Sequence, residues 1–289
     1  MIDLHTHTTA SDGRLSPAGL VARAADAGVT ILSVTDHDTV AAADPVSAAC
    51  SAAGIGFVPG IEITAAWLDT DVHVLGYFIA VGSPTLHTFL VDQRQRRIDR
   101  VRQIVERLGR LGLPLDADAL VKPAVEDASK SVGRPAVARA LVAAGHAISA
   151  DVAFQKWLSR GRPAFVPRLA VSPGEIVRRI HEAGGLASLA HPGLLLHDDW
   201  IPGFLDAGLD AIEAYHTEHD AGATARYLEL AQRSGVPVSG GSDFHGDSAH
   251  GAPAPGSTSL PREAYEALRR RAGLNGASRS VDRPGVPAP

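Results

Sequence analysis

The sequence contains a single cysteine, Cys50, among its 289 residues. One cysteine cannot form an intramolecular disulfide, and it cannot supply the several thiolates of a cysteine-rich metal site. The composition therefore excludes a disulfide framework and a thiolate metal centre. Any metal ion bound by this chain has to be held by histidine, aspartate and glutamate side chains.

Long hydrophobic runs are also absent. Nowhere do about 18 consecutive apolar residues occur, which is the length that a membrane-spanning helix requires. The N-terminus has no basic segment followed by an apolar one, because Asp3 and His5 come at once. We therefore expect a soluble, cytoplasmic protein without a membrane partner.

Lysine is scarce, since only Lys122, Lys130 and Lys156 occur among 27 basic residues and the other 24 are arginines. Biased genome composition explains most of these arginines. The net charge is -5 and the isoelectric point about 6.2, which argues against a broad basic surface for long nucleic acids. Small phosphorylated ligands and short RNA ends remain possible partners, and the sequence does not indicate an oligomeric state.

Short β-branched runs alternate with helical segments, a rhythm typical of an α/β fold. Ser16 with Pro17, and Ser172 with Glu175, mark helix starts, while glycines at 28, 54, 184, 235 and 273 mark helix ends. A further helix is expected from about Thr39. Strands are expected at residues 2–4, 31–34, around 57–62, 72–78, 186–189, 210–214 and 236–239.

Residues 86–163 interrupt this rhythm with helical patterns only, so we expect a helical insertion between two halves of a barrel, residues 1–85 and 164–274. The last residues, 275–289, are rich in Gly, Ser, Arg and Pro. Such a composition predicts a flexible tail.

Several polar residues follow the first three expected strands. His5 and His7 are two residues apart on extended backbone, so they point to the same side and can bind one metal ion. Asp12 and His37 lie in the loops that follow. Asp12-Gly13 could also be an ordinary turn, and Asp38 or Thr39 could cap a helix without any metal. Glu62 lies between two isoleucines, where a buried carboxylate needs a compensating cation.

The same pattern returns later in the chain with His191, Asp243 and His245. His73 lies within an apolar strand, where a histidine is more often a core residue. The shared position at strand ends matches the rim where barrel enzymes collect catalytic residues. Six imidazoles and three carboxylates are more ligands than one metal ion can bind, and they suit a cluster of two or three metal ions. Nitrogen and oxygen donors without sulfur favour Mn²⁺, Fe²⁺ or Zn²⁺ over Mg²⁺ or Ca²⁺.

Seven short motifs occur in order: His5-Thr6-His7, Ser11-Asp12-Gly13, Thr35-Asp36-His37-Asp38, Gly60-Ile61-Glu62, His73-Val74-Leu75-Gly76-Tyr77, Ala190-His191-Pro192 and Ser242-Asp243-Phe244-His245. Together they resemble the polymerase and histidinol phosphatase (PHP) superfamily, up to about residue 272. The resemblance implies a distorted, TIM-like (β/α)7 barrel. Asp12, where histidinol phosphatases commonly carry histidine, and Gly133-Arg134-Pro135 in the insertion are similar to bacterial nucleotide phosphoesterases, which include 3',5'-nucleoside bisphosphate phosphatase and a 5'-to-3' exoribonuclease.

The resemblance also implies three ligand sets. One metal would be held by His5, His7, Glu62 and Asp243, a second by Glu62, His73 and His191, and a third by Asp12, His37 and His245. One position departs from the family, because relatives often carry histidine where this chain has Ala136. Any substrate contact made at that position in relatives is therefore in doubt here.

Three arginines are candidates for binding the substrate phosphate. In the expected helix 92–110, Arg94 and Arg97 fall inside the apolar stripe, whereas Arg96, Arg100, Arg102, Arg107 and Arg110 fall outside it. Arginines on a buried face need an anionic partner, which could be a substrate phosphate or an internal acid such as Glu126. Arg134 is the third candidate, although Pro135 there could simply start a helix.

The expected reaction is hydrolysis of a nucleotide phosphate ester, or of the 5' end of short RNA, by a metal-bound hydroxide. His216, after an expected strand, is a candidate for protonating the leaving group, and Asp36 and Asp38 are expected to orient His37 or the chain around it. A metal-dependent amidohydrolase is one alternative. However, no lysine lies near a motif where it could serve as a carbamylated bridge between two metal ions. A metal-binding structural or interaction module is the other.

Overall fold

The computed structural model describes residues 1–68, 70–127, 130–167, 171–246 and 253–274. Seven strands form one sheet in the order β1-β2-β3-β4-β5-β6-β7. Their bounds are β1 Ile2–Asp3, β2 Ile31–Val34, β3 Gly56–Trp67, β4 Thr70–Tyr77, β5 Leu186–Leu189, β6 Ala211–His216 and β7 Val238–Gly241. The predicted tail, residues 275–289, lies outside the described residues.

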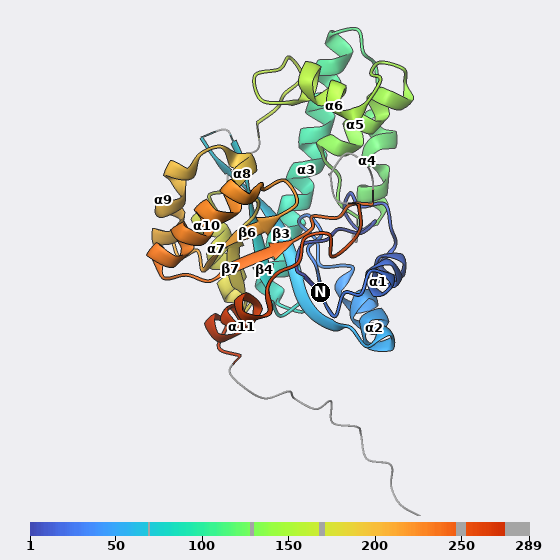
Figure 1. Ribbon diagram of the computed structural model, residues 1–289. Coiled ribbons are helices and arrows are strands. Elements are labelled where there is room, and N and C mark those ends of the chain that lie inside the picture. The colour runs from blue at the N-terminus through green and yellow to red at the C-terminus, as the bar shows by residue number, and fades with distance from the viewer. Residues whose placement is uncertain (69, 128–129, 168–170, 247–252, 275–289) are drawn as a thin grey trace, which may run out of the picture.

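The sheet curls into a nearly closed barrel (Figure 1). Backbone bonds join the two ends of the sheet, from Leu4 N to Gly240 O at 3.2 Å and from Asp243 N to His5 O at 2.8 Å. Gly241 permits this approach, because a Cβ atom there would lie 2.3 Å from His5 N. The α/β barrel expected from the sequence is thus confirmed.

Strands β3 and β4 differ from the expected parallel pattern. They form an antiparallel hairpin in which Glu62 pairs with Leu75 and Thr64 with His73, and β4 is also antiparallel to β5. The third strand therefore does not end near Glu62, as expected, but continues to Trp67. A hairpin needs no crossover helix, so one long strand can carry Glu62 at its middle.

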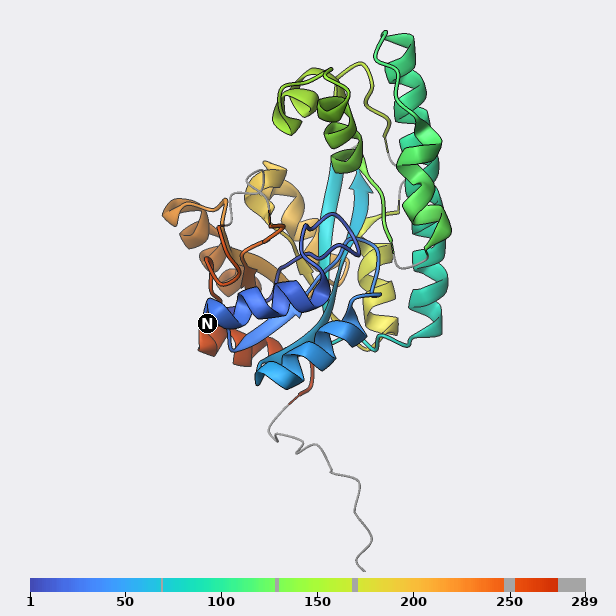
Figure 2. The same cartoon turned by 90° about the vertical axis from the view of Figure 1, so that its right-hand side faces the viewer.

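Helices cover the outside of the barrel (Figure 2). Their bounds are α1 Pro17–Asp26, α2 Ala43–Ala53, α7 Pro173–Glu182, α8 Pro192–Leu195, α9 Ile201–Asp206, α10 Ala221–Ser234 and α11 Arg262–Arg271, with a 3-10 turn at Asp198–Trp200. The caps at Ser16 and Ser172 and the left-handed Gly54 and Gly235 are as expected. The helix expected from Thr39 begins at Ala43 instead, without a side-chain cap.

A long helix leaves the barrel and carries a group of shorter helices above it (Figures 1 and 2). Their bounds are α3 Pro84–Arg110, α4 Ala117–Glu126, α5 Arg134–Ala143 and α6 Ala150–Ala153, followed by a π-helical turn at Phe154–Leu158. Leu86 and Leu90 of α3 pack in the barrel core, whereas Ile98 and Val101 pack in a separate core of these helices. The division of the chain at residues 86 and 163 stays a prediction, since α3 belongs to both cores.

Arg100 corrects the helical-wheel expectation for α3. It was expected outside the buried stripe, but only 7% of its surface is exposed. Its Nε donates to Val166 O at 2.8 Å, because the segment that returns to the barrel covers this side of α3. Within the described residues, no helix combines the length and the apolar character needed to cross a membrane.

Candidate metal centre

The nine predicted ligand side chains meet at one end of the barrel, and Glu62 lies at the centre of the group. Its Oε2 lies 2.9 Å from His37 Nδ1, 3.4 Å from His7 Nε2 and 3.5 Å from His5 Nε2. Its Oε1 lies 2.7 Å from His73 Nδ1 and 3.2 Å from His191 Nε2. One buried carboxylate thus faces five imidazoles from four different segments of the chain.

Asp243 forms a second focus of the cluster. Its Oδ1 lies 3.1 Å from His7 Nε2 and 3.2 Å from His5 Nε2. The backbone at Asp243 has a φ of 55°, and His191 has a φ of 26°. Positive φ angles are uncommon for residues other than glycine, although Asp and His adopt them more readily than most, and they often occur where function fixes the backbone.

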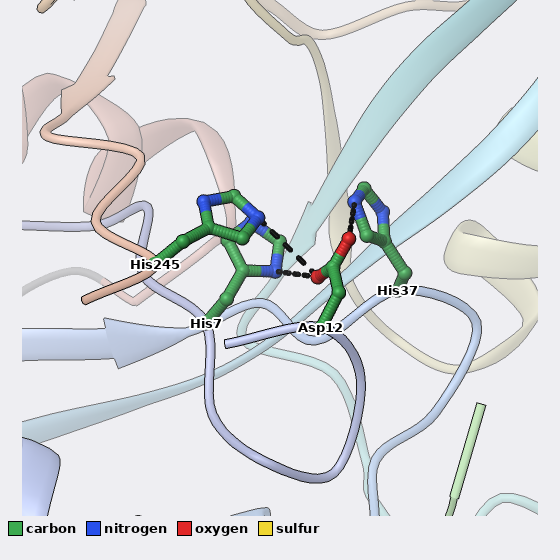
Figure 3. A group of neighbouring side chains, drawn as sticks. All are labelled: His7, Asp12, His37 and His245. Carbon is green, nitrogen blue, oxygen red and sulfur yellow. Dashed lines mark ion pairs between the residues drawn. The ribbon is translucent and has the colours of Figure 1, made fainter. Parts of the chain in front are cut away.

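Asp12 forms the third focus, where its carboxylate points between three imidazoles (Figure 3). Asp12 Oδ1 lies 3.3 Å from His245 Nε2 and 3.9 Å from His7 Nδ1, while Oδ2 lies 3.6 Å from His37 Nε2. His7 and His245 are 238 residues apart in the sequence, so only the fold brings them together.

The donor atoms of this cluster fit divalent cations. Buried ring nitrogens of His5, His7, His37 and His73 and carboxylate oxygens of Glu62 and Asp243 have no hydrogen-bond partner. Nitrogen lone pairs and carboxylate oxygens that converge without hydrogen bonds repel one another unless a proton or a cation lies between them. Nitrogen and oxygen donors without sulfur suit Mn²⁺, Fe²⁺ or Zn²⁺.

Four groups of donors have ligand atoms within 4.8 Å of one another: His7, Asp12, His37 and His245; His5, His7 and Asp243; His37, Glu62 and His73; and His5, Glu213 and His216. The first three overlap with the three ligand sets implied by the resemblance. His7 is added to the set of Asp12, Glu62 is missing from the set of His5, and His37 takes the place of His191 in the set of His73. The fourth group has no counterpart in the implied sets. Which residue binds which ion stays a prediction.

Burial and charge set the protonation of the cluster. Burial opposes charge on His5, but Glu213, Asp243 and Glu62 raise its pKa well above the ordinary value. Burial and neighbouring imidazoles lower the pKa of His7 to about 3. Burial acts against the charged form of Glu62, yet His37, His73 and His5 hold its pKa well below the ordinary value. The carboxylates are therefore ionised and able to bind a cation.

Glu213 is a functional candidate that the sequence reasoning missed. Its Oε1 accepts from His5 Nδ1 at 3.0 Å, and its Oε2 accepts from the backbone N of His191 at 2.7 Å. The bond to Nδ1 leaves His5 Nε2 facing Glu62 and Asp243, the orientation that a metal-binding histidine needs. Glu213 interrupts the apolar run of β6, and the same signal singled out Glu62.

His216, the candidate proton donor, lies beside the cluster with its Nε2 3.4 Å from Asp243 Oδ2. Its Nδ1 accepts a hydrogen bond from the backbone N of Glu218. A ring nitrogen that accepts has no proton, so the neutral ring carries its proton at Nε2. This tautomer suits a proton donor better than a metal ligand.

Asp36 and Asp38 shape the loops around the cluster. Asp36 accepts bonds from Thr8 N, Thr8 Oγ1 and Ser11 Oγ at 2.6 to 2.8 Å, and so it holds the loop that carries Asp12. Asp38 accepts from Thr64 N at 3.2 Å and binds the guanidinium of Arg97. The two carboxylates thus hold the loop of Asp12 and the side chain of Arg97, while a role in orienting His37 stays a prediction.

The three candidate arginines have different surroundings. Arg97 pairs with Asp38 and not with Glu126, which lies on the surface beside Lys122. Arg97 also lines a narrow cleft with Asp12 and His37, and Ala136 lies in the same cleft. Arg94 lines a separate cavity with Asp38 and His87. Arg134 pairs with Asp71 at 2.8 Å.

Comparisons with known proteins show the family to which this chain belongs. Residues 3–133 match the PHP domain family model. The chain is 36% identical over 250 residues to the 5'-3' exoribonuclease Rnm of Escherichia coli, covering 84% of each chain. It is 33% identical over 249 residues to the 3',5'-nucleoside bisphosphate phosphatase of Chromobacterium violaceum, covering 84% of this chain and 87% of that one. The chain belongs to the PHP family.

Two solved structures share its fold at 30% sequence identity. One, from Bifidobacterium adolescentis, is described as a candidate metal-dependent phosphoesterase and matches with a TM-score of 0.83 over 93% of this chain and 95% of that chain. The other, described as an amidohydrolase from Chromobacterium violaceum with bound sulfate, matches with a TM-score of 0.80 over 93% and 96%. The structure from Bifidobacterium adolescentis and the named relatives identify this chain as a metal-dependent phosphoesterase, and neither alternative reading is favoured.

Proposed function

We propose that this chain hydrolyses a phosphate ester of a nucleotide, with a nucleoside 3',5'-bisphosphate, a mononucleotide or the 5' end of short RNA as substrate. The observation that carries the proposal is the convergence of buried, unpartnered nitrogen and oxygen atoms around Glu62. The names of the exoribonuclease and bisphosphate phosphatase relatives support the substrate class.

The nine side chains would hold two or three divalent cations, with Mn²⁺ as first choice and Fe²⁺ or Zn²⁺ as alternatives. When bound, the cations supply a hydrolytic nucleophile from water near neutral pH and neutralise charge on the phosphoryl oxygens. Glu213 and Asp36 hold the ligands in place. His73, with 22% of its side chain exposed, and His191, with 15%, lie on the side that substrate can approach.

Arg97 would orient the substrate phosphate at the cleft that it shares with Asp12 and His37. Asp38 fixes the Nε side of its guanidinium, and Nη2 donates to Thr64 Oγ1 at 3.2 Å. A guanidinium held on one side presents its remaining donors in a defined direction, which suits a phosphate. Substrate binding by Arg94 and Arg134 stays a prediction.

A substrate panel tests the proposal. Adenosine 3',5'-bisphosphate, AMP and a 5'-phosphorylated oligoribonucleotide are each incubated with the Mn²⁺-loaded protein, and released phosphate and nucleotides are measured. We expect hydrolysis of at least one of them and its loss after chelation. Turnover of none of the three by protein that binds Mn²⁺ would refute the proposal.

His216→Asn tests the proton donor. We expect kcat to fall about 10²-fold for nucleotide substrates, whose alkoxide leaving group needs a proton. For p-nitrophenyl phosphate, whose leaving group is stable as an anion, kcat should change little. An equal loss on both substrates would instead assign His216 to positioning Asp243.

A further inference from the structure

A second, arginine-lined cavity lies beside α3, outside the metal centre. It has a volume of about 270 Å³ and lies between α3 and residues 166–167. Four arginines line it, Arg96, Arg97, Arg100 and Arg107, against a single carboxylate, Asp99. For a chain of net charge -5, this is a local concentration of positive charge.

Internal acids compensate only part of this charge. Asp38 pairs with Arg97, and one oxygen of Asp71 serves both Arg100, at 3.4 Å, and Arg134, at 2.8 Å. Arg107 donates to the backbone oxygen of Phe165, a neutral acceptor. Among the described residues, neither Arg96 nor Arg107 forms an ion pair, so the cavity keeps an excess of positive charge that suits an anionic ligand.

The cavity lies next to the metal centre, because Arg97 contributes to the lining of both the cavity and the cleft of Asp12 and His37. From Arg96, the positive side chains continue on one side of α3 to Arg107, which lies about 16 Å further along the helix at 1.5 Å per residue. Such a length exceeds a single phosphate group and indicates an extended anion.

From this geometry we infer that the cavity binds the backbone of single-stranded RNA whose 5' end lies at the metal centre. The inference rests on the proposed function and selects the RNA end among its substrates. The strand passes Arg97 and follows α3 toward Arg107, with successive phosphates on the guanidinium groups. A positively charged groove that follows the backbone is how sequence-independent binding of single strands is achieved.

The test uses the exposed rim of the cavity, where Arg96 and Gln103 lie. A variant with Arg96→Glu and Gln103→Glu is compared with the wild type and with a control of equal charge change, Arg233→Glu with Gln232→Glu, at exposed positions of α10. Substrates are a 5'-phosphorylated ten-nucleotide RNA and adenosine 3',5'-bisphosphate. Binding of the same RNA with a fluorescent 3' end is followed by anisotropy in the presence of chelator, which prevents cleavage.

We expect the rim variant to raise KM for the RNA about tenfold, with little change in kcat, and to weaken RNA binding by a similar factor. The slope of log affinity against log salt should become shallower by about one unit, because at least one phosphate contact is lost. The control variant should match the wild type. Hydrolysis of the bisphosphate should be unchanged in all three proteins.

Two results would overturn the inference. One is equal RNA affinity in the rim variant, the control and the wild type. The other is an equal rise in KM for RNA and bisphosphate, which would show that the cavity binds a small phosphate only. If the wild type cleaves the bisphosphate but neither binds nor cleaves the RNA, the inference fails while the proposed function stands. If no substrate is cleaved, the anisotropy measurement still decides the inference.

Discussion

Replacing Glu62 by glutamine is expected to abolish metal loading and hydrolysis together, with kcat reduced about 10³-fold or more. Glutamine keeps the shape of the side chain but removes its negative charge. In the wild type, this charge faces the ring nitrogens of five histidines at 2.7 to 3.5 Å. A neutral amide is a poor ligand for Mn²⁺ or Zn²⁺, and it cannot bridge two cations as a carboxylate can.

The measurement combines metal content by elemental analysis with phosphate release from the best substrate of the panel. Glu229→Gln is the matched control, because Glu229 lies on the surface of α10 with 68% of its side chain exposed. Thermal unfolding of both metal-free variants checks that the barrel folds. A Glu62→Gln protein with wild-type metal content and rate would remove Glu62 from the metal centre and, with it, the organising residue of the proposed mechanism.

Much of the fold is readable from local signals. Strands β2 and β5 have the bounds expected from their apolar runs. Helices α1, α2 and α10 end at or just before Gly28, Gly54 and Gly235, because a left-handed glycine satisfies the last carbonyls of a helix. These features depend on neighbours within a few residues, which is why sequence alone can predict them.

Most of the residues at the candidate metal centre could be singled out because they are chemically out of place in their own segments, whereas Asp12 lies in a loop where an aspartate is ordinary. Imidazoles and carboxylates directly after buried strands, or inside them, are costly without a partner. Glu213 carries the same signal within β6, between Ile212 and Ala214, and a consistent use of that criterion would have found it. The missing information was its partner His5, which is 208 residues away.

Long-range pairings explain the remaining differences. The sequence does not show that β3 turns back on β4 as a hairpin, because both strands are buried over most of their length and lack the alternation that is typical of an antiparallel pair. Arg97 meets Asp38 across 59 residues, and Arg100 is covered by a segment 66 residues further on. A helical wheel describes only one helix and cannot anticipate what packs over it.

Manganese is expected to stabilise the protein, and increasingly so as the pH rises from 6 to 8.5. The reason lies in His245, whose Nδ1 donates to Asp243 O at 2.8 Å and whose Nε2 faces Asp12. Although burial opposes it, Asp12 and Asp243 raise the pKa of His245 to about 10 in the metal-free protein. A cation that takes Nε2 as a ligand must displace this proton, so acid weakens binding.

The sign follows from linkage. A histidine with a raised pKa in the folded state stabilises the metal-free protein fully below about pH 6.5, its unfolded value, and this contribution is lost as the pH rises toward about 10. The metal-bound form does not carry that proton, so it does not lose this contribution. The difference in stability between the Mn²⁺-loaded and chelated protein therefore grows across the measured range.

Thermal unfolding with Mn²⁺ or with chelator at pH 6, 7 and 8.5 measures this difference. An ion at 1,000 times its Kd contributes about 4 kcal/mol, and each kcal/mol shifts the Tm of a protein of this size by about 2–4 °C. We expect a shift of about 10 °C at pH 8.5 and a clearly smaller one at pH 6. In His245→Gln the dependence on pH should be weaker, since the proton held between Asp12 and Asp243 is gone. A shift of constant size across the range, in wild type and variant alike, would show that metal binding does not compete with protons at His245.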